Sequence, residues 1–307
     1  MDFKTADLER YIASCHSTQY QRFGITDRVF DQGMTHVRPR LNSDRTNRTI
    51  LFPGSFNPPH CGHETLLRRA FENSQDIDVI AAIVLLLDDD DVEAKCRHLG
   101  QRFTLAKEDR VRLWRGYGPH DWRWVHDSSE RDFRRRLTDV ITGDGFDPKF
   151  VVLAGPDYIK RDSRPPCNSW GCEETMVSDA SRPADFTTRR HALEQLTDSE
   201  LTQALDPNYF EDLIAFVRSE NEKEVKAVRV CLRRGSTKGT IRFIPSKDQA
   251  DAVSSNRVRQ IIESGMRETL RENLEPFALN PDILIDIIHT RERNALSDPH
   301  GRFDTGS

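Results

Sequence analysis

The stretch from residue 49 to residue 71, TILFPGSFNPPHCGHETLLRRAF, constrains the fold more than any other part of the chain. It begins like the end of a buried strand, passes through a Gly- and Pro-rich turn, and then carries apolar residues at helical spacing up to Phe71. The first amides of a helix lack partners, and the helix dipole favours negative charge there. His60 and His63 stand at this helix start, so the stretch predicts a nucleotide pocket.

Further apolar runs predict more strands. The runs at 77–87 (IDVIAAIVLLL) and 150–154 (FVVLA) are nearly continuous, as expected of parallel strands buried on both faces. The spacing of apolar residues and the capping residues predict helices at about 104–115, 130–141 and 254–265. Short apolar segments predict further strands at 121–127, 228–232 and 241–244. Thr104 is expected to cap the first of these helices. Trp122 and Trp124 are expected on one face of the strand at 121–127, as core residues.

Several polar segments separate these elements. Asp88 to Asp91 follow an apolar run directly, and we interpret them as a solvated loop rather than a metal site. Residues 160–224 are predicted to be an insertion. Its first part, 161–185, is rich in Pro, Ser and charge and indicates a loop, whereas 191–217 has helical periodicity.

The chain is therefore expected to contain one main domain with additions. Residues 1–47 form an N-terminal extension with one amphipathic helix and a polar connector. The main domain spans 48–290 and contains the insertion. Residues 291–307 form a polar tail.

Charge and cysteine usage narrow the class of protein. The net charge is −5, from 45 basic and 50 acidic residues, so the chain as a whole has no basic footprint for nucleic acid or an anionic membrane. No apolar run is long enough to span a bilayer, and the N-terminus has no signal-peptide pattern. Six scattered cysteines without a secretion signal indicate reduced thiols, so we expect a cytoplasmic or nuclear protein.

The turn at residues 54–63, GSFNPPHCGH, resembles the first signature of the nucleotidyltransferase superfamily. That pattern runs Gly, any, Phe, any, Pro and ends in His-x-Gly-His or a relative of it. The residues that match it are Gly54, Phe56, Pro58, His60, Gly62 and His63. The strand before the turn and the amphipathic helix after it strengthen this interpretation.

Weaker matches follow in the order in which the family has them. Gly155 and Asp157 in GPD resemble the family's second signature and come directly after a predicted strand. Ligands bind at the carboxyl ends of such strands, where an aspartate can accept hydrogen bonds from ribose hydroxyls. Lys95 lies where the family often has lysines in a mobile segment, and Arg110 matches an arginine common in the following helix.

The last signature lies at the start of the predicted helix at 254–265. VSSNRVR resembles the family's Ile-Ser-Ser-Thr-x-x-Arg: Ser254, Ser255 and Arg259 align, while Asn256 replaces the threonine. A serine pair at a helix start near arginines is also a second anion cradle. Arg233 matches an arginine that closes the preceding strand in the family.

The resemblance covers about residues 48–290 and is closest to nicotinamide mononucleotide adenylyltransferases of eukaryotic type. It implies an α/β fold with a doubly wound, mostly parallel Rossmann-like sheet. It also implies transfer of AMP from ATP to nicotinamide mononucleotide, with Mg²⁺ arriving with ATP. The catalytic residues would be His60, His63 and Arg259, and the nucleotide-binding residues Gly54, Ser55, Phe56, Asn57, Lys95, Gly155, Asp157, Arg233, Ser254 and Ser255.

The acceptor and the activity have alternatives. The nicotinamide branch usually has a Trp-Glu pair after its third strand and a tryptophan on the next helix, but here Ser128, Ser129, Glu130 and Phe133 stand in that region. Phosphopantetheine, or a phosphocholine-type alcohol with CTP, therefore stays open as acceptor. A catalytically silent nucleotide-binding scaffold is a further alternative, in which the insertion binds a protein. A homo-oligomer also stays open.

Overall fold

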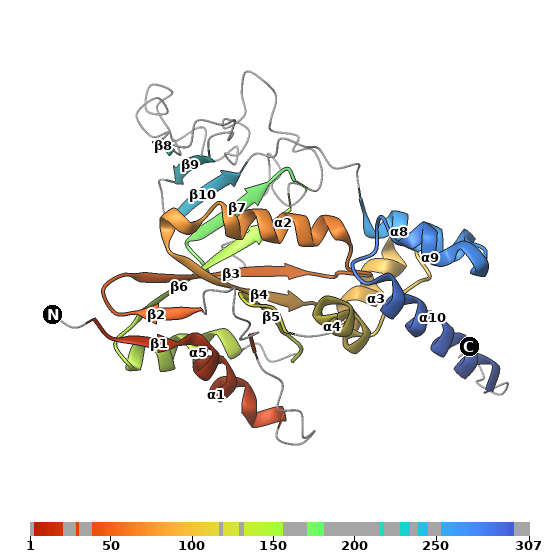
Figure 1. Ribbon diagram of the computed structural model, residues 1–307, viewed down its shortest axis with the longest axis horizontal. Helices are drawn as coiled ribbons and strands as arrows, with labels where there is room; N and C mark the ends of the chain where they lie inside the picture. The colour runs from red at the N-terminus through yellow and green to blue at the C-terminus, as the bar shows by residue number, and fades with distance from the viewer. Residues whose placement is uncertain are drawn as a thin grey trace.

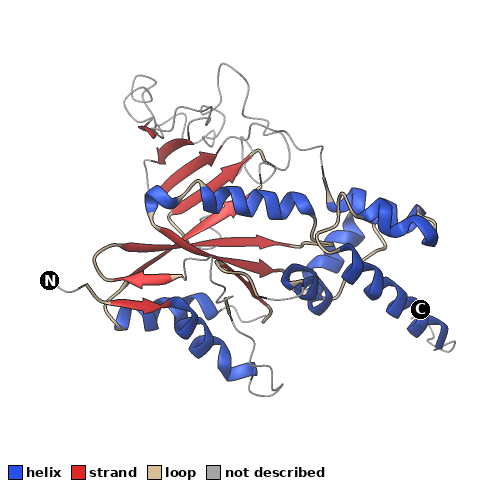
Figure 2. Ribbon diagram, in the orientation of Figure 1, coloured by secondary structure: helices blue, strands red, loops and turns tan. Residues whose placement is uncertain are grey.

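An eight-stranded sheet forms the centre of the molecule, with helices on both faces (Figures 1 and 2). The computed structural model describes residues 3–20, 29–30, 39–116, 119–128, 132–155, 171–180, 215–217, 228–233, 239–244 and 253–297. In spatial order the strands are β5 (Arg123–His126), β4 (Val79–Leu86), β3 (Thr46–Gly54), β6 (Asp147–Ala154), β7 (Glu174–Ser178), β10 (Gly239–Ile244), β9 (Val228–Arg233) and β8 (Ala215–Val217). From β5 to β10 all strands run parallel, and β9 and β8 are antiparallel additions at one edge.

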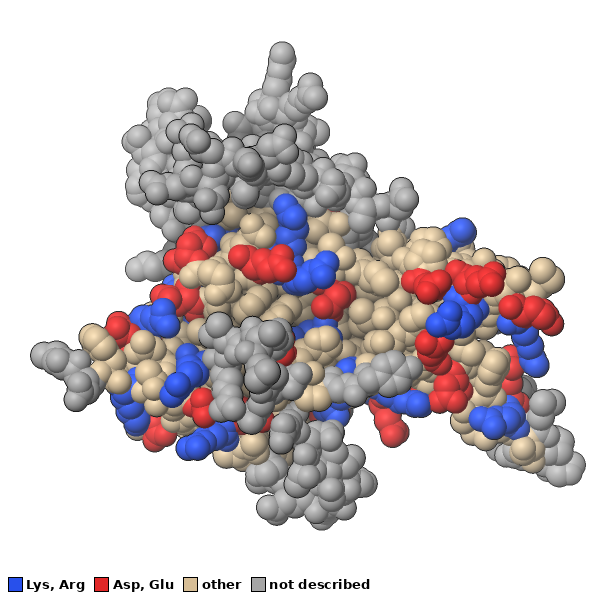
Figure 3. Space-filling view, in the orientation of Figure 1, with Lys and Arg blue, Asp and Glu red and all other residues tan. Residues whose placement is uncertain are grey.

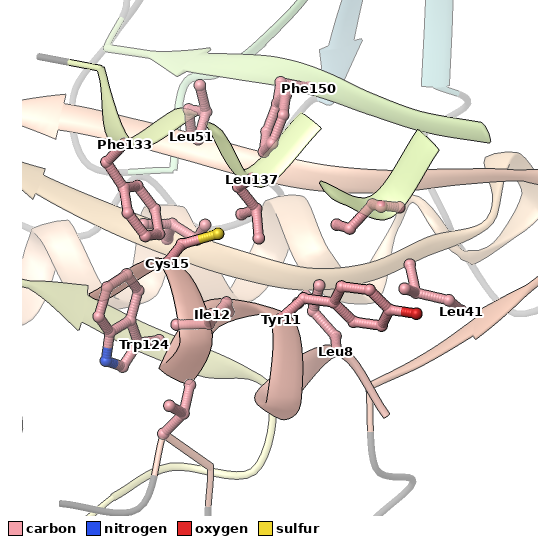
Figure 4. Packing of buried hydrophobic residues seen from close by; sticks show 14 of the residues in the cluster. Leu8, Tyr11, Ile12, Cys15, Leu41, Leu51, Trp124, Phe133, Leu137 and Phe150 are labelled. Carbon is pink, nitrogen blue, oxygen red and sulfur yellow. The ribbon is translucent and has the colours of Figure 1, made fainter. Parts of the chain in front are cut away.

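Two hydrophobic clusters hold the helices on the sheet. Alternation along β3 sends Leu51 into one cluster and Ile50 and Phe52 into the other. The first cluster packs under α1 (Leu8–Tyr20) and α5 (Phe133–Gly143), as Figure 4 shows. The second packs under α2 (Cys61–Glu72) and α4 (Lys107–Arg115). The predicted doubly wound α/β fold is therefore confirmed.

The N-terminal segment adds a small antiparallel pair, β1 (Thr5–Asp7) and β2 (Arg40–Asn42), next to α1. The C-terminal segment forms α8 (Ser255–Ser264), α9 (Leu270–Leu274) and α10 (Pro281–Ser297), which pack with α4 around a third cluster. α10 continues past residue 290, where the sequence suggested a polar tail. The remaining elements are α3 (Asp89–His98) and two short 3-10 helices, η1 (Gln75–Ile77) and η5 (Arg267–Thr269).

The order of the strands reverses at β3. From β3 the chain builds outward through β4 to β5, then returns to form β6 on the other side of β3. In open α/β sheets, ligands bind at such a reversal, outside the carboxyl ends of the strands. The fold thus directs attention to the residues that follow β3 and β6.

Two local predictions are wrong at the start of helices. Asp88 to Asp91 do not form a loop, because α3 begins at Asp89 with Asp88 as its N-cap residue. Three aspartates in a first turn are favourable there because the helix dipole is positive at that end. α4 begins at Lys107 with Ala106 as N-cap, so Thr104 does not cap it.

The loop predicted at 161–185 contains a central strand, which corrects that prediction. β7 lies between β6 and β10, and its residues from Thr175 to Ser178 are buried. The strand has only five residues and lies between polar segments, so no long apolar run indicated it in the sequence. Residues 215–217 form β8 rather than the end of a helix, and the helical pattern at 191–214 lies outside the described residues.

The two tryptophans near β5 do not share one face, contrary to the prediction. Trp124 belongs to the cluster under α1 and α5, while Trp122 packs against the cluster under α2 and α4. Trp122 precedes the strand, and its ring stacks on Phe71 with 4.1 Å between ring centroids. Trp124 is a buried core residue, as predicted, whereas Trp122 is partly buried against the core.

Acidic and basic side chains are interspersed over the face seen in Figure 3. Among the described residues, no helix combines the length and the apolar character needed to cross a membrane. Cys15, Cys61, Cys96 and Cys172 are free thiols.

Candidate functional site

A pocket of about 480 Å³ lies at the carboxyl ends of β3 and β6, where α2 and α8 both begin. The structure brings together here most of the residues that the sequence singled out. Those that line the pocket are Gly54, Ser55, Phe56, Asn57, His60, His63, Lys95, Gly155, Ser254, Ser255 and Arg259. Three of them come from the chain's last quarter, so the fold unites segments about 200 residues apart.

Two residues predicted to bind nucleotide are not among these lining residues. Asp157 lies outside the described residues. Arg233 ends β9, which is antiparallel to β10, and it pairs there with Gly239 at the start of β10. That position of its backbone is at the amino edge of the parallel strands, opposite the pocket, and nucleotide binding by Arg233 stays a prediction.

The turn after β3 is held by the ring of Phe56. This buried ring contacts Phe52, Trp114 and His63 at centroid distances of 5.1, 5.1 and 4.9 Å. The backbone of Phe56 has a φ of 45°, a left-handed conformation that a non-glycine residue holds only where its surroundings fix it. The ring lies so close to Gly54 that a Cβ there would stand 2.6 Å from its nearest atom.

We therefore expect Gly54→Ala to destabilise the protein by about 1–3 kcal/mol, because overpacking against a buried ring forces side chains or backbone to shift. Denaturant unfolding measures the change. Gly143→Ala is the matched control, since a Cβ at Gly143 meets nothing within 4 Å. Equal stabilities of the two variants would contradict the role given to the Phe56 ring.

Asn57 ties the same turn to the segment that leads into α4. Its buried amide donates to the Phe103 carbonyl at 3.0 Å, and its Oδ1 accepts from the Leu105 amide at 2.8 Å. The amide nitrogen also approaches Cys96 Sγ at 3.4 Å. Asn57 therefore fixes the position of the turn.

The two histidines stack on each other at the start of α2. Their ring centroids are 3.6 Å apart, with an interplanar angle of 26°. The His60 backbone amide donates to His63 Nδ1 at 3.2 Å, so a neutral His63 carries its proton on Nε2. The backbone of His60 is held from the other side by an isolated bridge to Ala278. The histidine pair thus adds a hydrogen-bond donor to the amides of the helix start.

α8 supplies the second helix start. Ser254 caps it by accepting from the Arg257 amide at 3.2 Å, and the Ser255 hydroxyl donates to the Pro58 carbonyl at 2.9 Å. Arg259 lies one turn further and donates to the Asn57 carbonyl. Burial lowers the pKa of Arg259, yet a guanidinium stays charged at neutral pH. The helix therefore places a buried cation beside the turn.

Asn256 connects that cation to the other side of the pocket. Its Oδ1 accepts from Arg259 and, at 3.0 Å, from Gln101 Nε2. Both Asn256 and Gln101 line the pocket. The sequence identified Asn256 only as a departure from threonine; its contact with Gln101, 155 residues earlier, carried no sequence signal.

The lining of the pocket favours anions. Lys95 Nζ stands 3.3 Å from Ser55 Oγ, and Arg259 and the two helix starts add further positive potential. The described lining residues include no carboxylate. No group of three or more His, Cys, Asp or Glu side chains suited to a metal occurs within the described ranges. The positively charged lining residues suit a phosphorylated ligand.

Comparison with known proteins identifies the family of the chain. Residues 51–261, more than half of the chain, match the family model described as cytidylyltransferase-like. Two solved structures of Plasmodium falciparum nicotinic acid mononucleotide adenylyltransferase, complexed with APC and with NaAD, are similar at a TM-score of 0.41. Each is 11% identical in sequence to this chain, and the match covers 80% of this chain and 96% of the Plasmodium falciparum chain. The comparison with curated proteins finds no significant match. The chain belongs to the cytidylyltransferase-like family of nucleotidyltransferases.

Proposed function

We propose that this nucleotidyltransferase transfers AMP from ATP to nicotinamide mononucleotide, giving NAD and pyrophosphate. The observation that carries the proposal is the convergence of two helix starts on one pocket, each with its own cationic or hydrogen-bonding side chains. Such an arrangement suits a polyphosphate, because each helix start can hold one part of it.

The proposed step is an in-line displacement. A phosphate oxygen of the acceptor attacks the α-phosphorus of ATP, and the bond from that phosphorus to the oxygen of the leaving pyrophosphate breaks. The attacking phosphate is already an anion, so the step needs no general base and no covalent intermediate. Positioning and charge stabilisation supply the catalysis.

Each residue receives a role in this scheme. His63 and His60 hold oxygens of the α- and β-phosphates, while Arg259 and the amides of Ser254 and Ser255 hold the pyrophosphate. Lys95 adds positive charge, and the turn formed by Gly54, Ser55, Phe56 and Asn57 shapes the cradle. Gly155 and Asp157 would hold the adenosine ribose. We propose that Mg²⁺ enters with ATP and takes its oxygen ligands from the phosphates.

Asn256→Asp tests the assignment of Arg259. A carboxylate beside the guanidinium would pair with it and cancel its charge toward phosphate, so we expect about tenfold weaker binding of an ATP analogue, or ~1.4 kcal/mol. Titration calorimetry measures the dissociation constant. Asn273→Asp, on the exposed surface of α9, adds the same charge and should leave it unchanged. Equal affinities of both variants for the ATP analogue would contradict the role of Arg259 in binding the phosphates.

A panel of nucleotides and acceptors tests the reaction itself. Purified protein with magnesium is offered ATP or CTP, each with nicotinamide mononucleotide, phosphopantetheine or phosphocholine, and pyrophosphate release is followed. The proposal predicts turnover with ATP and nicotinamide mononucleotide. Turnover with another pair would replace the acceptor or the nucleotide. Binding of nucleotide without turnover for any pair would favour a silent scaffold.

A further inference from the structure

Arg123, at the start of β5, is a buried cation outside the nucleotide pocket. It pairs across the sheet with Ala82 of β4, which belongs to the cluster under α2 and α4, so its side chain points to that face. Burial lowers the pKa of Arg123 to about 10, and the guanidinium therefore stays charged at neutral pH. A buried cation needs partners, because an unpaired buried charge is costly.

The partners of Arg123 come from two helices. Its Nη1 forms an ion pair with Glu64, in the first turn of α2. Its Nη2 donates to the Trp114 carbonyl at 3.1 Å, and its guanidinium lies over the Trp114 ring, 5.0 Å from the ring centroid. Trp114 belongs to α4 and is fully buried. Arg123 therefore joins the edge strand β5 to both α2 and α4.

Both partners lead to His63. Glu64 directly follows His63, and the backbone amides of the two residues donate to the His60 carbonyl at 3.4 and 2.9 Å. The Trp114 ring contacts the Phe56 ring at a centroid distance of 5.1 Å, and Phe56 contacts the His63 ring at 4.9 Å. The contacts of Arg123 thus restrain the backbone of His63 through Glu64, and its ring through Trp114 and Phe56.

The other end of α2 is held by a comparable arginine. Arg242 of β10 is buried, binds Asp76 Oδ1 at 2.6 Å and donates to the Asn73 carbonyl at 3.0 Å. Asn73 is the C-cap of α2, ten residues after His63, which is about 15 Å along the helix axis at 1.5 Å per residue. Arg242 therefore makes the same kinds of contact, with a carboxylate and a carbonyl, far from the histidine pair.

We propose that Arg123 is a positioning residue for nucleotidyl transfer. Its ion pair with Glu64 and its contacts with Trp114 hold His63 in the orientation that the phosphate contact requires. This inference rests on the proposed function, in which His63 holds a phosphate oxygen, and extends it to a residue that does not line the pocket. A catalytic group displaced by about 1 Å can lose on the order of 10²-fold in rate.

The test replaces Arg123 by methionine, which removes the charge and the donors but keeps an unbranched side chain. We expect kcat with ATP and nicotinamide mononucleotide to fall about tenfold or more, because His63 loses its orientation. The dissociation constant of an ATP analogue should change less than about twofold, because the α8 contacts to the phosphates remain. Arg123→Lys, which can still pair with Glu64, should retain most of the rate.

Arg242→Met is the matched control. It also removes a buried arginine beside α2, so we expect the denaturation midpoint to fall in both methionine variants. The control should nevertheless keep kcat within about twofold of the wild type. A role of Arg123 in stability alone would lower the midpoint without this difference in kcat.

The ring of His63 gives a measurement that needs no turnover. Its NMR signals are identified by their loss in His63→Ala and are then followed in each arginine variant. We expect the His63 signals to shift in Arg123→Met and to stay in place in Arg242→Met.

The outcomes separate this inference from the proposed function. A wild type without turnover, together with shifted His63 signals in Arg123→Met, would overturn the reaction and support the positioning of His63 by Arg123. Unshifted His63 signals in Arg123→Met, or equal losses of kcat in the two methionine variants, would overturn the role of Arg123. Should Arg123→Met not fold, Glu64→Ala breaks the same ion pair from its less buried side. Unshifted His63 signals in Glu64→Ala would likewise contradict the proposal.

Discussion

Replacing His63 by alanine is expected to lower the rate of nucleotidyl transfer by about 10²–10³-fold, as the loss of one preorganised donor does at other transferring groups. His63 lies at the start of α2, stacks on His60, and holds its Nδ1 against the His60 backbone amide. In the proposed reaction its other nitrogen donates to a phosphate oxygen that gains charge in the transition state. Steady-state kinetics with saturating ATP measure the loss.

His289→Ala is the matched control, because His289 is exposed on α10 and does not line the pocket. It should keep the wild-type rate. Circular dichroism and thermal unfolding of both variants establish that each is folded. A folded His63→Ala variant with near wild-type turnover would show that the α2 helix start is not where the reaction occurs.

The largest effect on stability is expected at Arg110. Its guanidinium is fully buried and donates to the carbonyls of Leu105, Ser55 and Leu87 at 3.1, 2.8 and 2.9 Å. It also binds Asp89 Oδ1 at 2.7 Å. Arg110 thereby joins the turn after β3, the end of β4 and the start of α3. Arg110→Ala leaves three carbonyls without this donor and removes a buried cation, so we expect a loss of about 3–5 kcal/mol.

Denaturant unfolding measures the free energy of unfolding of Arg110→Ala and of Arg112→Ala, a control in the same helix. Arg112 pairs with Asp286, and both side chains are half exposed, so its loss should cost less than about 1 kcal/mol. A similar midpoint for the two variants would contradict the structural role of Arg110. The sequence identified Arg110 only through its resemblance to a family arginine.

The parts of the site that could be predicted from sequence are the local ones. The strand, turn and helix around Gly54 to His63 are contiguous, and Ser254 precedes its helix as a capping serine should. In each case the chemistry depends on residues within a few positions of one another. The resemblance then supplied the order of these segments, and the structure unites them in one pocket.

The parts that could not be predicted depend on distant partners or on short elements. Asn57 binds residues about 46 to 48 positions later, and the Asn256 contact spans 155. β7 is too short and too mixed in composition to stand out, yet it completes the sheet beside β6. The sequence also did not indicate that β9 runs antiparallel to β10, because a strand's orientation is set by its neighbours rather than by its own sequence.

The proposed reaction is tested by NAD formation from ATP and nicotinamide mononucleotide with magnesium, measured by chromatography for the wild type and for His63→Ala. We expect NAD and pyrophosphate in equal amounts from the wild type, and a loss of about 10²–10³-fold in the rate of the folded variant. Absence of NAD from a wild-type protein that binds an ATP analogue would contradict it.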